Sequence, residues 1–223
     1  MKNFIKAFRL TVVMCVFLGI SYVLVLWLFG KAVGPGHGNA AVVTTDGKVV
    51  GAANVGQQFT DDKYFWGRPS YAGGGYDATA SCGSNKGPTN DEYLNEVKAR
   101  IDTLLAHHPY LKRKDVPAEL VTASGSGLDP DITPRSARVQ VRRVAAARHI
   151  DAQLVENLVE QSIEKPLMGA FGPAKVNVLK LNVALDKLRG AEEKGKVNRR
   201  QAESRRQASL GFCRGAKEED EVN

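Results

Sequence analysis

The chain has 223 residues and a formal net charge of +7, from 31 Lys and Arg against 24 Asp and Glu. The positive balance is modest, and no basic stripe is interleaved with aromatic residues, so the composition argues against a nucleic-acid-binding protein. Three cysteines exclude a framework of several disulfides. Cys82 and Cys213 could form one disulfide. We expect Cys213 to lie in a mobile tail, however, and therefore expect both thiols to be free.

An uninterrupted apolar run near the N-terminus organises the rest of the chain. Residues 10–29 contain no Asp, Glu, Lys, Arg or His. A helix of about twenty residues spans roughly 30 Å, the thickness of the hydrocarbon core of a bilayer. The alternative is a signal peptide cleaved near residues 38–40, but such peptides have shorter apolar cores. We therefore predict a retained transmembrane helix over residues 10–30.

The flanking charges predict the orientation of this helix. Lys2, Lys6 and Arg9 precede the apolar run, and only Lys31 follows closely. Because positive residues stay on the cytoplasmic side, residues 1–9 should lie in the cytoplasm and the rest of the chain outside.

Two small residues interrupt the apolar run. Gly19 and Ser21 would leave a shallow notch through which a neighbouring helix can approach closely. The alternative is that a single glycine has no special role in a membrane span.

A short linker and a hairpin follow the predicted membrane helix. Residues 31–40 are rich in glycine and read as a flexible linker. Two β-rich runs then flank Asp46-Gly47, a strong signal for a two-residue hairpin turn. We predict one compact α+β domain over residues 41–189. Residues 190–223 are charged and poor in apolar residues, which indicates a disordered tail.

Residues 61–90 combine aromatic residues with many Gly, Ser and Asn and have no clear periodicity. Aromatic side chains carry apolar area that favours burial, so we expect an ordered, irregular surface. Arg68 could pair with a carboxylate or with backbone carbonyls. Either the aromatic residues form a functional surface or they cap the core of the domain. They are Tyr64, Phe65, Trp66, Tyr71 and Tyr76.

A helix should follow this irregular stretch. Thr89 and Glu92 match a capping box, and Pro109 should end the helix. We expect His107 and His108 in its last turn, where positive charge suits the helix dipole. The apolar stripe of this helix is Leu94, Val97, Ile101, Leu104 and Leu105.

Three further helices are expected downstream. Thr133 should cap the first, with Pro134 at its first position, and Asp151 should cap the second. Val176 should end a short strand before a third helix capped by Asn177, although alternation would also allow a longer strand. The expected buried residues are Ala137, Val141, Val144 and Ala145 in the first helix; Leu154, Val155, Leu158, Val159 and Ile163 in the second; and Val178, Leu181, Leu185 and Leu188 in the third.

Familiar catalytic motifs are missing. The chain has no G-x-x-x-x-G-K-[ST] phosphate loop, no H-E-x-x-H and no C-x-x-C. Ser124 and Ser126 could serve an anchored hydrolase, but they do not form a nucleophile elbow and no base accompanies them in sequence. We expect no catalytic residue, no metal site and no cofactor of its own.

Several long motifs together resemble the C subunit of the Kdp potassium-transporting ATPase. They are GQQF at residues 56–59, YFWGRPS at 64–70, SCGSNKGPTN at 81–90, LVTASGSGLDPDITP at 120–134, QVRRVAAAR at 140–148 and VNVLKLNVALD at 176–186. The resemblance runs from the apolar helix to about Leu188, and the tail after Arg189 departs from it. The residues that carry the resemblance, which we take as candidate docking or motif residues, are Gln57, Phe59, Tyr64, Phe65, Arg68, Pro69, Ser81, Ser84, Asn85, Ser124, Ser126, Leu128, Asp129 and Gln140.

The resemblance implies an accessory subunit in the inner (cell) membrane of a bacterium. Its expected partners are a channel-like A subunit that conducts potassium, a P-type B subunit that hydrolyses ATP, the small F subunit, and membrane lipid. The family is described as an assembly factor and as a catalytic chaperone that raises the ATP affinity of the B subunit. A periplasmic domain cannot touch cytoplasmic ATP, so such an effect would have to be a coupling between separate sites.

Two functional hypotheses follow. In the first, the irregular aromatic surface docks on the outer face of the A subunit near the potassium entrance. The alternative is a free-standing, membrane-anchored extracellular module that binds a ligand.

Overall fold

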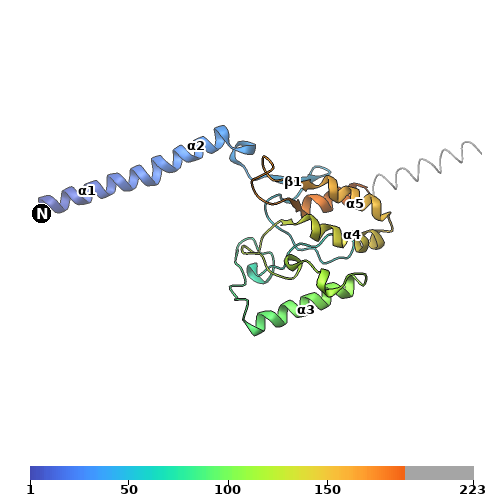
Figure 1. Cartoon of the computed structure of the whole chain (residues 1–223). Coiled ribbons are helices and arrows are strands. Elements are labelled where there is room, and N and C mark those ends of the chain that lie inside the picture. Colours follow the sequence, from blue (N-terminus) through green and yellow to red (C-terminus); the bar gives the residue numbers. More distant parts are fainter. Residues whose placement is uncertain (189–223) are drawn as a thin grey trace, which may run out of the picture. The chain divides into compact units, whose positions relative to one another are not determined.

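The computed structural model describes residues 1–188 (Figure 1). The predicted tail over residues 190–223 and Cys213 lie outside the described residues. The chain divides into two units, Met1–Val55 and the part that begins at Gly56. The hairpin that we expected inside the domain therefore groups with the N-terminal helix.

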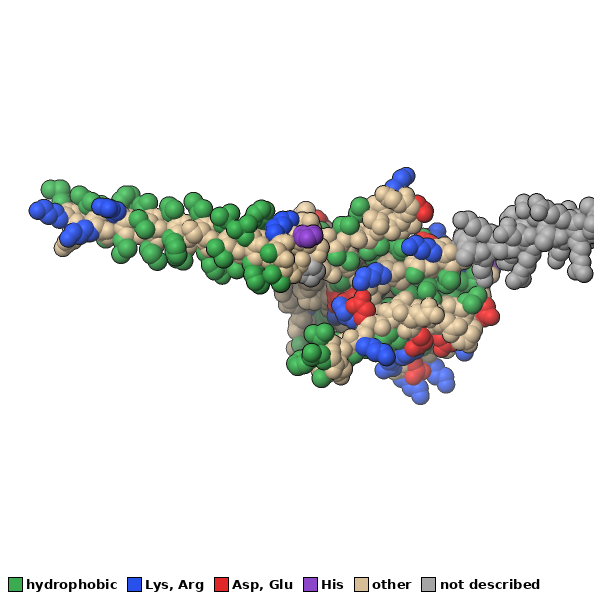
Figure 2. Space-filling model, turned by 90° about the horizontal axis from the view of Figure 1, so that it is seen from above, with side chains coloured by type: hydrophobic (Ala, Val, Ile, Leu, Met, Phe, Trp, Pro, Cys, Tyr) green, Lys and Arg blue, Asp and Glu red, His purple; other side chains and the backbone are tan. Residues whose placement is uncertain are grey.

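The first unit begins with one continuous apolar helix. It consists of α1 (Lys2–Val16), a π-helical segment η1 (Phe17–Tyr22) and α2 (Val23–Val33). The helix is long and apolar enough to cross a membrane, with a mean hydropathy of 2.6 in its best window. Figure 2 shows hydrophobic side chains around it and Lys and Arg side chains at its N-terminal end.

The helix extends beyond the predicted membrane span, residues 10–30, at both ends, and the limits of the span itself stay a prediction. The helix includes the basic residues at its N-terminal end and continues to Val33, so the expected linker begins as helix. It stops at Gly34, where a Cβ atom would lie 2.4 Å from the carbonyl oxygen of Gly30. A short 3-10 turn, η2 (Pro35–Gly38), follows.

The π-helical segment contains both residues of the predicted notch. Apart from its chain neighbours and the backbone of its own helix, no described atom lies within 4 Å of the position that a Cβ of Gly19 would occupy. Gly19 borders a shallow groove on the helix surface, whereas Ser21 is not among the residues that line it. Helix packing at this groove stays a prediction. The lining residues are Leu10, Thr11, Met14, Cys15, Leu18 and Gly19.

The hairpin prediction is confirmed. β1 (Val42–Thr45) pairs antiparallel with β2 (Lys48–Ala52), and Thr45 lies opposite Lys48. The two turn residues, Asp46 and Gly47, both have positive φ angles, 51° and 76°. Such angles are required by the type I′ turn that joins tightly paired strands.

The second unit combines helices with a small antiparallel sheet, which confirms the α+β class. The helices are α3 (Asp91–His107), α4 (Pro134–Arg148), α5 (Ala152–Gln161) and a final helix described over residues 178–188. The strands β3 (Asp131–Ile132), β4 (Ile163–Glu164) and β5 (Lys175–Asn177) have the order β3-β5-β4. Three 3-10 turns are η3 (Ala72–Gly74), η4 (Arg113–Asp115) and η5 (Ala118–Leu120).

Side-chain caps start the helices of this unit. Thr133 accepts a hydrogen bond from the amide of Ser136, and Asp151 accepts one from Gln153, as predicted. The amide of Lys180 donates to Oδ1 of Asn177, which begins the final helix and rules out the longer strand.

The predicted cap of α3 is wrong by one residue. Asn90, not Thr89, accepts the hydrogen bond from the amide of Tyr93. Glu92 lies 3.3 Å from the ammonium of Lys86 instead of reaching back to complete a capping box. Asn is as good a cap as Thr, so the local signal allowed either register.

The core lies between α4, α5 and the final helix and includes Phe65 from the irregular stretch. The inner faces of the helices follow the predicted spacing with three exceptions: Leu94 on α3 and Leu154 on α5 are exposed, and Ile163 lies in β4 after α5 has ended. The fully buried apolar residues include Phe65, Val144, Val155, Val159, Val176, Leu181 and Leu185.

Candidate functional site

Two buried amide side chains hold the irregular stretch as a strand partner would. The amide of Phe65 donates to Oδ1 of Asn182 at 2.8 Å, and Nδ2 of Asn182 donates back to the carbonyl of Phe65 at 3.0 Å. Gln140 does the same for Trp66, at 2.8 and 3.1 Å. Both side chains are almost completely buried, so they supply the backbone partners that water cannot.

Two arginines hold the residues just before Phe65. Nη1 of Arg143 donates to the carbonyl of Asp62 at 2.6 Å, and Nη2 donates to the carbonyl of Tyr64 at 3.0 Å. Nε of Arg148 donates to the carbonyl of Lys63 at 2.6 Å. The guanidinium of Arg143 also lies 4.1 Å from the centre of the Trp66 ring, a cation–π distance. We call Gln140, Arg143, Arg148 and Asn182 the loop clamp.

The guanidinium of Arg143 is buried, and hydrogen-bond acceptors around it offset the loss of its hydration. Its side chain is 3% exposed, and burial lowers the pKa of Arg143 to about 10. The carboxylate of Asp62 opposes this shift from 3.4 Å. The guanidinium therefore stays charged at neutral pH and donates to several acceptors, as a buried charge must.

His108 completes this buried network in its neutral form. Nδ1 lies 2.7 Å from the carbonyl of Leu104, and Nε of Arg143 donates to Nε2 at 3.1 Å. Only a neutral ring with its proton on Nδ1 satisfies both contacts. Burial lowers the pKa of His108 to about 4. The prediction that His108 supplies positive charge at the end of α3 is therefore wrong, because the ring is buried.

A second set of contacts orders the following residues. Arg68 does both things expected of it: Nη1 donates to Asp129 at 3.0 Å, and Nη2 donates to the carbonyl of Ala123 at 3.1 Å. The hydroxyl of Tyr76 donates to the carbonyl of Arg68, and burial raises the pKa of Tyr76 to about 12. The hydroxyl of Ser70 donates to the carbonyl of Gly127.

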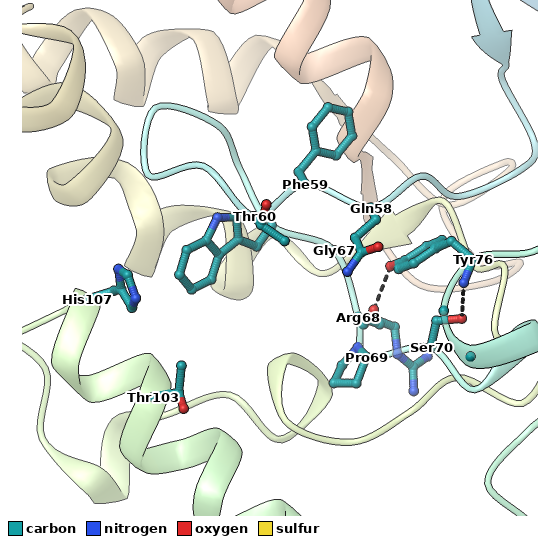
Figure 3. Close-up of a pocket in the computed structure, with 13 residues that line it drawn as sticks. Gln58, Phe59, Thr60, Gly67, Arg68, Pro69, Ser70, Tyr76, Thr103 and His107 are labelled. Carbon is teal, nitrogen blue, oxygen red and sulfur yellow. Dashed lines mark hydrogen bonds between the residues drawn. The ribbon is translucent and has the colours of Figure 1, made fainter.

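An open cavity of about 420 Å³ lies over this ordered stretch (Figure 3). Thr103 and His107 of α3 border one side in the close-up, and Arg68, Tyr76 and Gln58 border the other. The aromatic rings give an apolar floor, and the guanidinium and hydroxyl groups add a few polar positions. The lining residues are Gln58, Phe59, Thr60, Trp66, Gly67, Arg68, Pro69, Ser70, Gly74, Gly75, Tyr76, Thr103 and His107.

The structure separates the candidate residues into three groups. Phe59, Arg68 and Pro69 line the cavity, whereas Phe65, Ser124 and Gln140 are buried and hold the loops from beneath. The remaining candidates lie in the connected loops or half-buried around them. They are Gln57, Tyr64, Ser81, Ser84, Asn85, Ser126, Leu128 and Asp129.

Several of these loop residues hold one another. The hydroxyl of Ser81 donates to the carbonyl of Ser126 at 2.9 Å, and the amide of Leu128 donates to the hydroxyl of Ser126 at 3.1 Å. The carbonyl of Leu128 accepts from the amide of Gly56 at 2.8 Å. Ser124 is buried, whereas Ser126 is exposed and its hydroxyl accepts a hydrogen bond within its own loop. Among residues 1–188, no group of His, Cys, Asp and Glu is arranged to hold a metal ion.

The sequence reasoning missed most of the loop clamp. Arg143, Arg148 and Asn182 lie in motifs that carry the resemblance but were not among the candidate site residues, and neither were Thr103 and His107 of the cavity. A signal for the first three was present, because polar residues interrupt helix faces that are otherwise apolar. Such positions indicate a buried polar partner elsewhere in the chain.

Comparison with known proteins decides the family. The model of the family described as "KdpC: K+-transporting ATPase, c chain" matches residues 4–187. The chain belongs to the KdpC family. This confirms the resemblance inferred from the motifs, and it makes the chain a subunit of a potassium-transporting ATPase.

Relatives named potassium-transporting ATPase KdpC subunit are similar over most of the chain. A protein of Phocaeicola vulgatus is 69% identical over 187 residues, which are 84% of this chain and 99% of the relative. One of Bacteroides fragilis is 67% identical over 189 residues, 85% of this chain and 99% of the relative. One of Flavobacterium johnsoniae is 47% identical over 189 residues, 85% of this chain and all of the relative.

The loop-clamp contacts predict that Asn182→Ala strongly destabilises the folded domain. The substitution leaves the buried amide and carbonyl of Phe65 without partners, so we expect a loss of about 2–4 kcal/mol in the free energy of unfolding. Amide hydrogen exchange at residues 62–66 should become faster. Urea denaturation of the full chain in mild detergent measures the first effect, and exchange with mass spectrometry measures the second.

Asn157→Ala is the matched control, because Asn157 is exposed and bonds only to a neighbouring side chain on α5. It should change stability by less than about 0.5 kcal/mol. Equal effects of the two substitutions would contradict the clamp.

The buried His108 predicts a specific pH dependence. Its pKa is about 4 in the folded chain and about 6.5 when unfolded. Between these values the unfolded chain binds more protons, so the free energy of unfolding falls as the pH is lowered from about 6.5 to about 4. The contribution should be on the order of 2 kcal/mol.

Urea denaturation at pH 7 and at pH 4.5 gives the change in the free energy of unfolding with pH. Comparing this change between the unsubstituted chain and its variants isolates the contribution of His108. His108→Gln should lose that part of the pH dependence, since carboxylate titration is common to both chains. His149→Gln, at the exposed end of α4, should keep it. An unchanged pH dependence in His108→Gln would show that the imidazole is not the titrating group.

Proposed function

We propose that the chain is a non-catalytic subunit whose periplasmic domain docks on the outer face of the channel-like A subunit, near the potassium entrance, and stabilises the complex. The observation that carries this proposal is the pre-organised cavity surface over residues 58–76. Four buried side chains order its backbone before any partner arrives, which lowers the entropic cost of association. Exposed loops on a rigid scaffold are common binding surfaces.

The charge pattern supports the proposed orientation. The apolar helix has Lys and Arg at its N-terminal end, and by the positive-inside rule this pattern supports a cytoplasmic position for that end. In this arrangement the chain is a single-pass protein of the bacterial inner membrane, and it meets the A, B and F subunits as well as lipid.

An effect on ATP affinity would be indirect. In the proposed orientation the domain and the ATP site of the B subunit lie on opposite sides of the membrane. A catalytic-chaperone role, in which ATP is bound by the complex, would therefore be a coupling free energy between separated sites. The chain itself then contributes no ATP ligand and no cofactor.

The cavity also favours a second candidate function. Its volume of about 420 Å³ falls within the range of small-ligand pockets, roughly 300–1,000 Å³. A membrane-anchored module that binds a small ligand outside the cell, without the other subunits, is the alternative.

Cysteine labelling tests the orientation. In a Cys213→Ser chain the remaining cysteines are Cys15, inside the apolar helix, and the exposed Cys82. A membrane-impermeant maleimide should label Cys82 in intact spheroplasts. In a chain without native cysteines, Asn3→Cys should react only after lysis. The reverse pattern would place the domain in the cytoplasm and overturn the proposed docking site.

Filling the cavity tests the docking. Thr103 is exposed on α3 and borders the cavity, so Thr103→Trp should obstruct a partner without disturbing the core. We expect retention of the A and B subunits on the tagged chain to fall about tenfold, which corresponds to about 1.4 kcal/mol.

Lys98→Trp adds the same ring to the same helix outside the cavity and should retain both subunits. Unchanged retention with Thr103→Trp would count against docking through the cavity. If both variants keep the complex but only Thr103→Trp loses a bound small molecule, the alternative function is favoured.

A further inference from the structure

A tight turn projects three large apolar side chains from the second unit. The segment 165–174 joins β4 to β5, and within it the backbones of Leu167 and Phe171 exchange two hydrogen bonds of 3.0 Å. Met168 and Gly169 turn the chain with positive φ angles of 53° and 75°. We call Leu167, Met168 and Phe171 the apolar tip.

The exposure of the apolar tip is unusual for this domain. The exposed fractions are 73% for Leu167, 88% for Met168 and 67% for Phe171. No other large hydrophobic side chain described from residue 56 to 188 is more than 41% exposed. Figure 2 shows hydrophobic side chains gathered at one protruding edge of the domain. Apolar groups gathered on a surface usually mark a site of contact with a partner or a membrane.

The backbone of the turn argues that this exposure is built into the fold. A non-glycine residue with positive φ is uncommon, and Met168 occupies that conformation at the most exposed point of the turn. The antiparallel pairing of β4 with β5 holds the base of the segment. The three side chains are therefore presented outward by a defined hairpin.

We propose that the apolar tip inserts into the interfacial region of the lipid bilayer. This inference rests on the proposed membrane anchorage of the N-terminal helix. The tip is convex and its three side chains come from a single turn, a shape suited to a fluid surface that needs no complementary pocket. Lys165 begins the segment, and lysines near a bilayer surface are attracted to anionic headgroups. Lys175, which follows the segment, is instead paired with Asp131 at 2.7 Å.

The connection between the apolar helix and the second unit is short enough to keep the domain close to the bilayer. Seven residues lie between the end of the helix at Val33 and Ala41, and Ala41 accepts a hydrogen bond from Ala53 across the closed hairpin. Three more residues lead to Gly56. Even fully extended, this connection reaches only about 40 Å. A domain on so short a tether meets the bilayer surface often, whatever its other partners.

Insertion would give the domain a second point of attachment. A tip held at the interface would determine which face of the domain meets the membrane. The cavity surface would then be presented to a neighbouring membrane protein in one restricted range of orientations.

Depth-dependent quenching in vesicles tests the proposal. The full chain, with Cys15, Cys82 and Cys213 replaced by Ala, would carry Met168→Cys labelled with an environment-sensitive fluorophore. It would be reconstituted in vesicles of phosphatidylethanolamine and phosphatidylglycerol containing lipids spin-labelled near the headgroup. We expect a blue-shifted emission and at least threefold stronger quenching than in the Leu154→Cys control, whose site on α5 is exposed but isolated.

A second variant separates insertion from accidental proximity. Leu167→Ser with Phe171→Ser should return the Met168→Cys label to an aqueous spectrum, while circular dichroism of the chain stays unchanged because both residues are exposed.

The outcomes distinguish this proposal from the anchorage on which it rests. A chain that resists alkaline carbonate extraction but carries an aqueous, unquenched label at position 168 overturns the tip proposal alone. Shielding that appears only when the other subunits are reconstituted overturns it as well, because the tip would then be a protein contact. A chain that is extracted by carbonate overturns both.

Discussion

The candidate surface depends on one physical constraint: an irregular backbone can be buried only if its polar groups find partners. Residues 62–66 run past the inner faces of α4 and the final helix without a strand beside them. Asn182 and Gln140 pair with the backbone of two successive residues as a strand would, and two arginines bind the preceding carbonyls. Phe65 is thus held in the core, while Trp66 and the residues that follow it line the cavity.

The same constraint explains why charge lies inside this domain. Arg143 is buried among carbonyl oxygens, a neutral histidine and the Trp66 ring, which together replace much of the hydration that the guanidinium loses. Truncating one partner of such a network leaves others unsatisfied, so its members act together. The network therefore joins α3, α4 and the irregular stretch around the buried guanidinium of Arg143.

Much of the fold could be predicted because its signals are local. The apolar helix, the Asp46-Gly47 hairpin, the caps at Thr133, Asp151 and Asn177 and the helical spacing of buried residues all follow from neighbours in sequence. The errors arose where two local solutions were nearly equal in energy, as with Thr89 and Asn90 as caps of α3. The role of His108 was wrong for a different reason, since its burial comes from segments far away in sequence.

The sequence by itself determined a single apolar helix, an α+β domain behind it and, through several long motifs, the KdpC family. Only the tertiary structure decided which candidate residues face outward, which hold the loops from beneath, and that Leu167, Met168 and Phe171 project from one turn. Periodicity reports which face of an element is apolar. It cannot report which distant polar side chain satisfies a buried carbonyl, because that partner is chosen by packing between segments more than seventy residues apart.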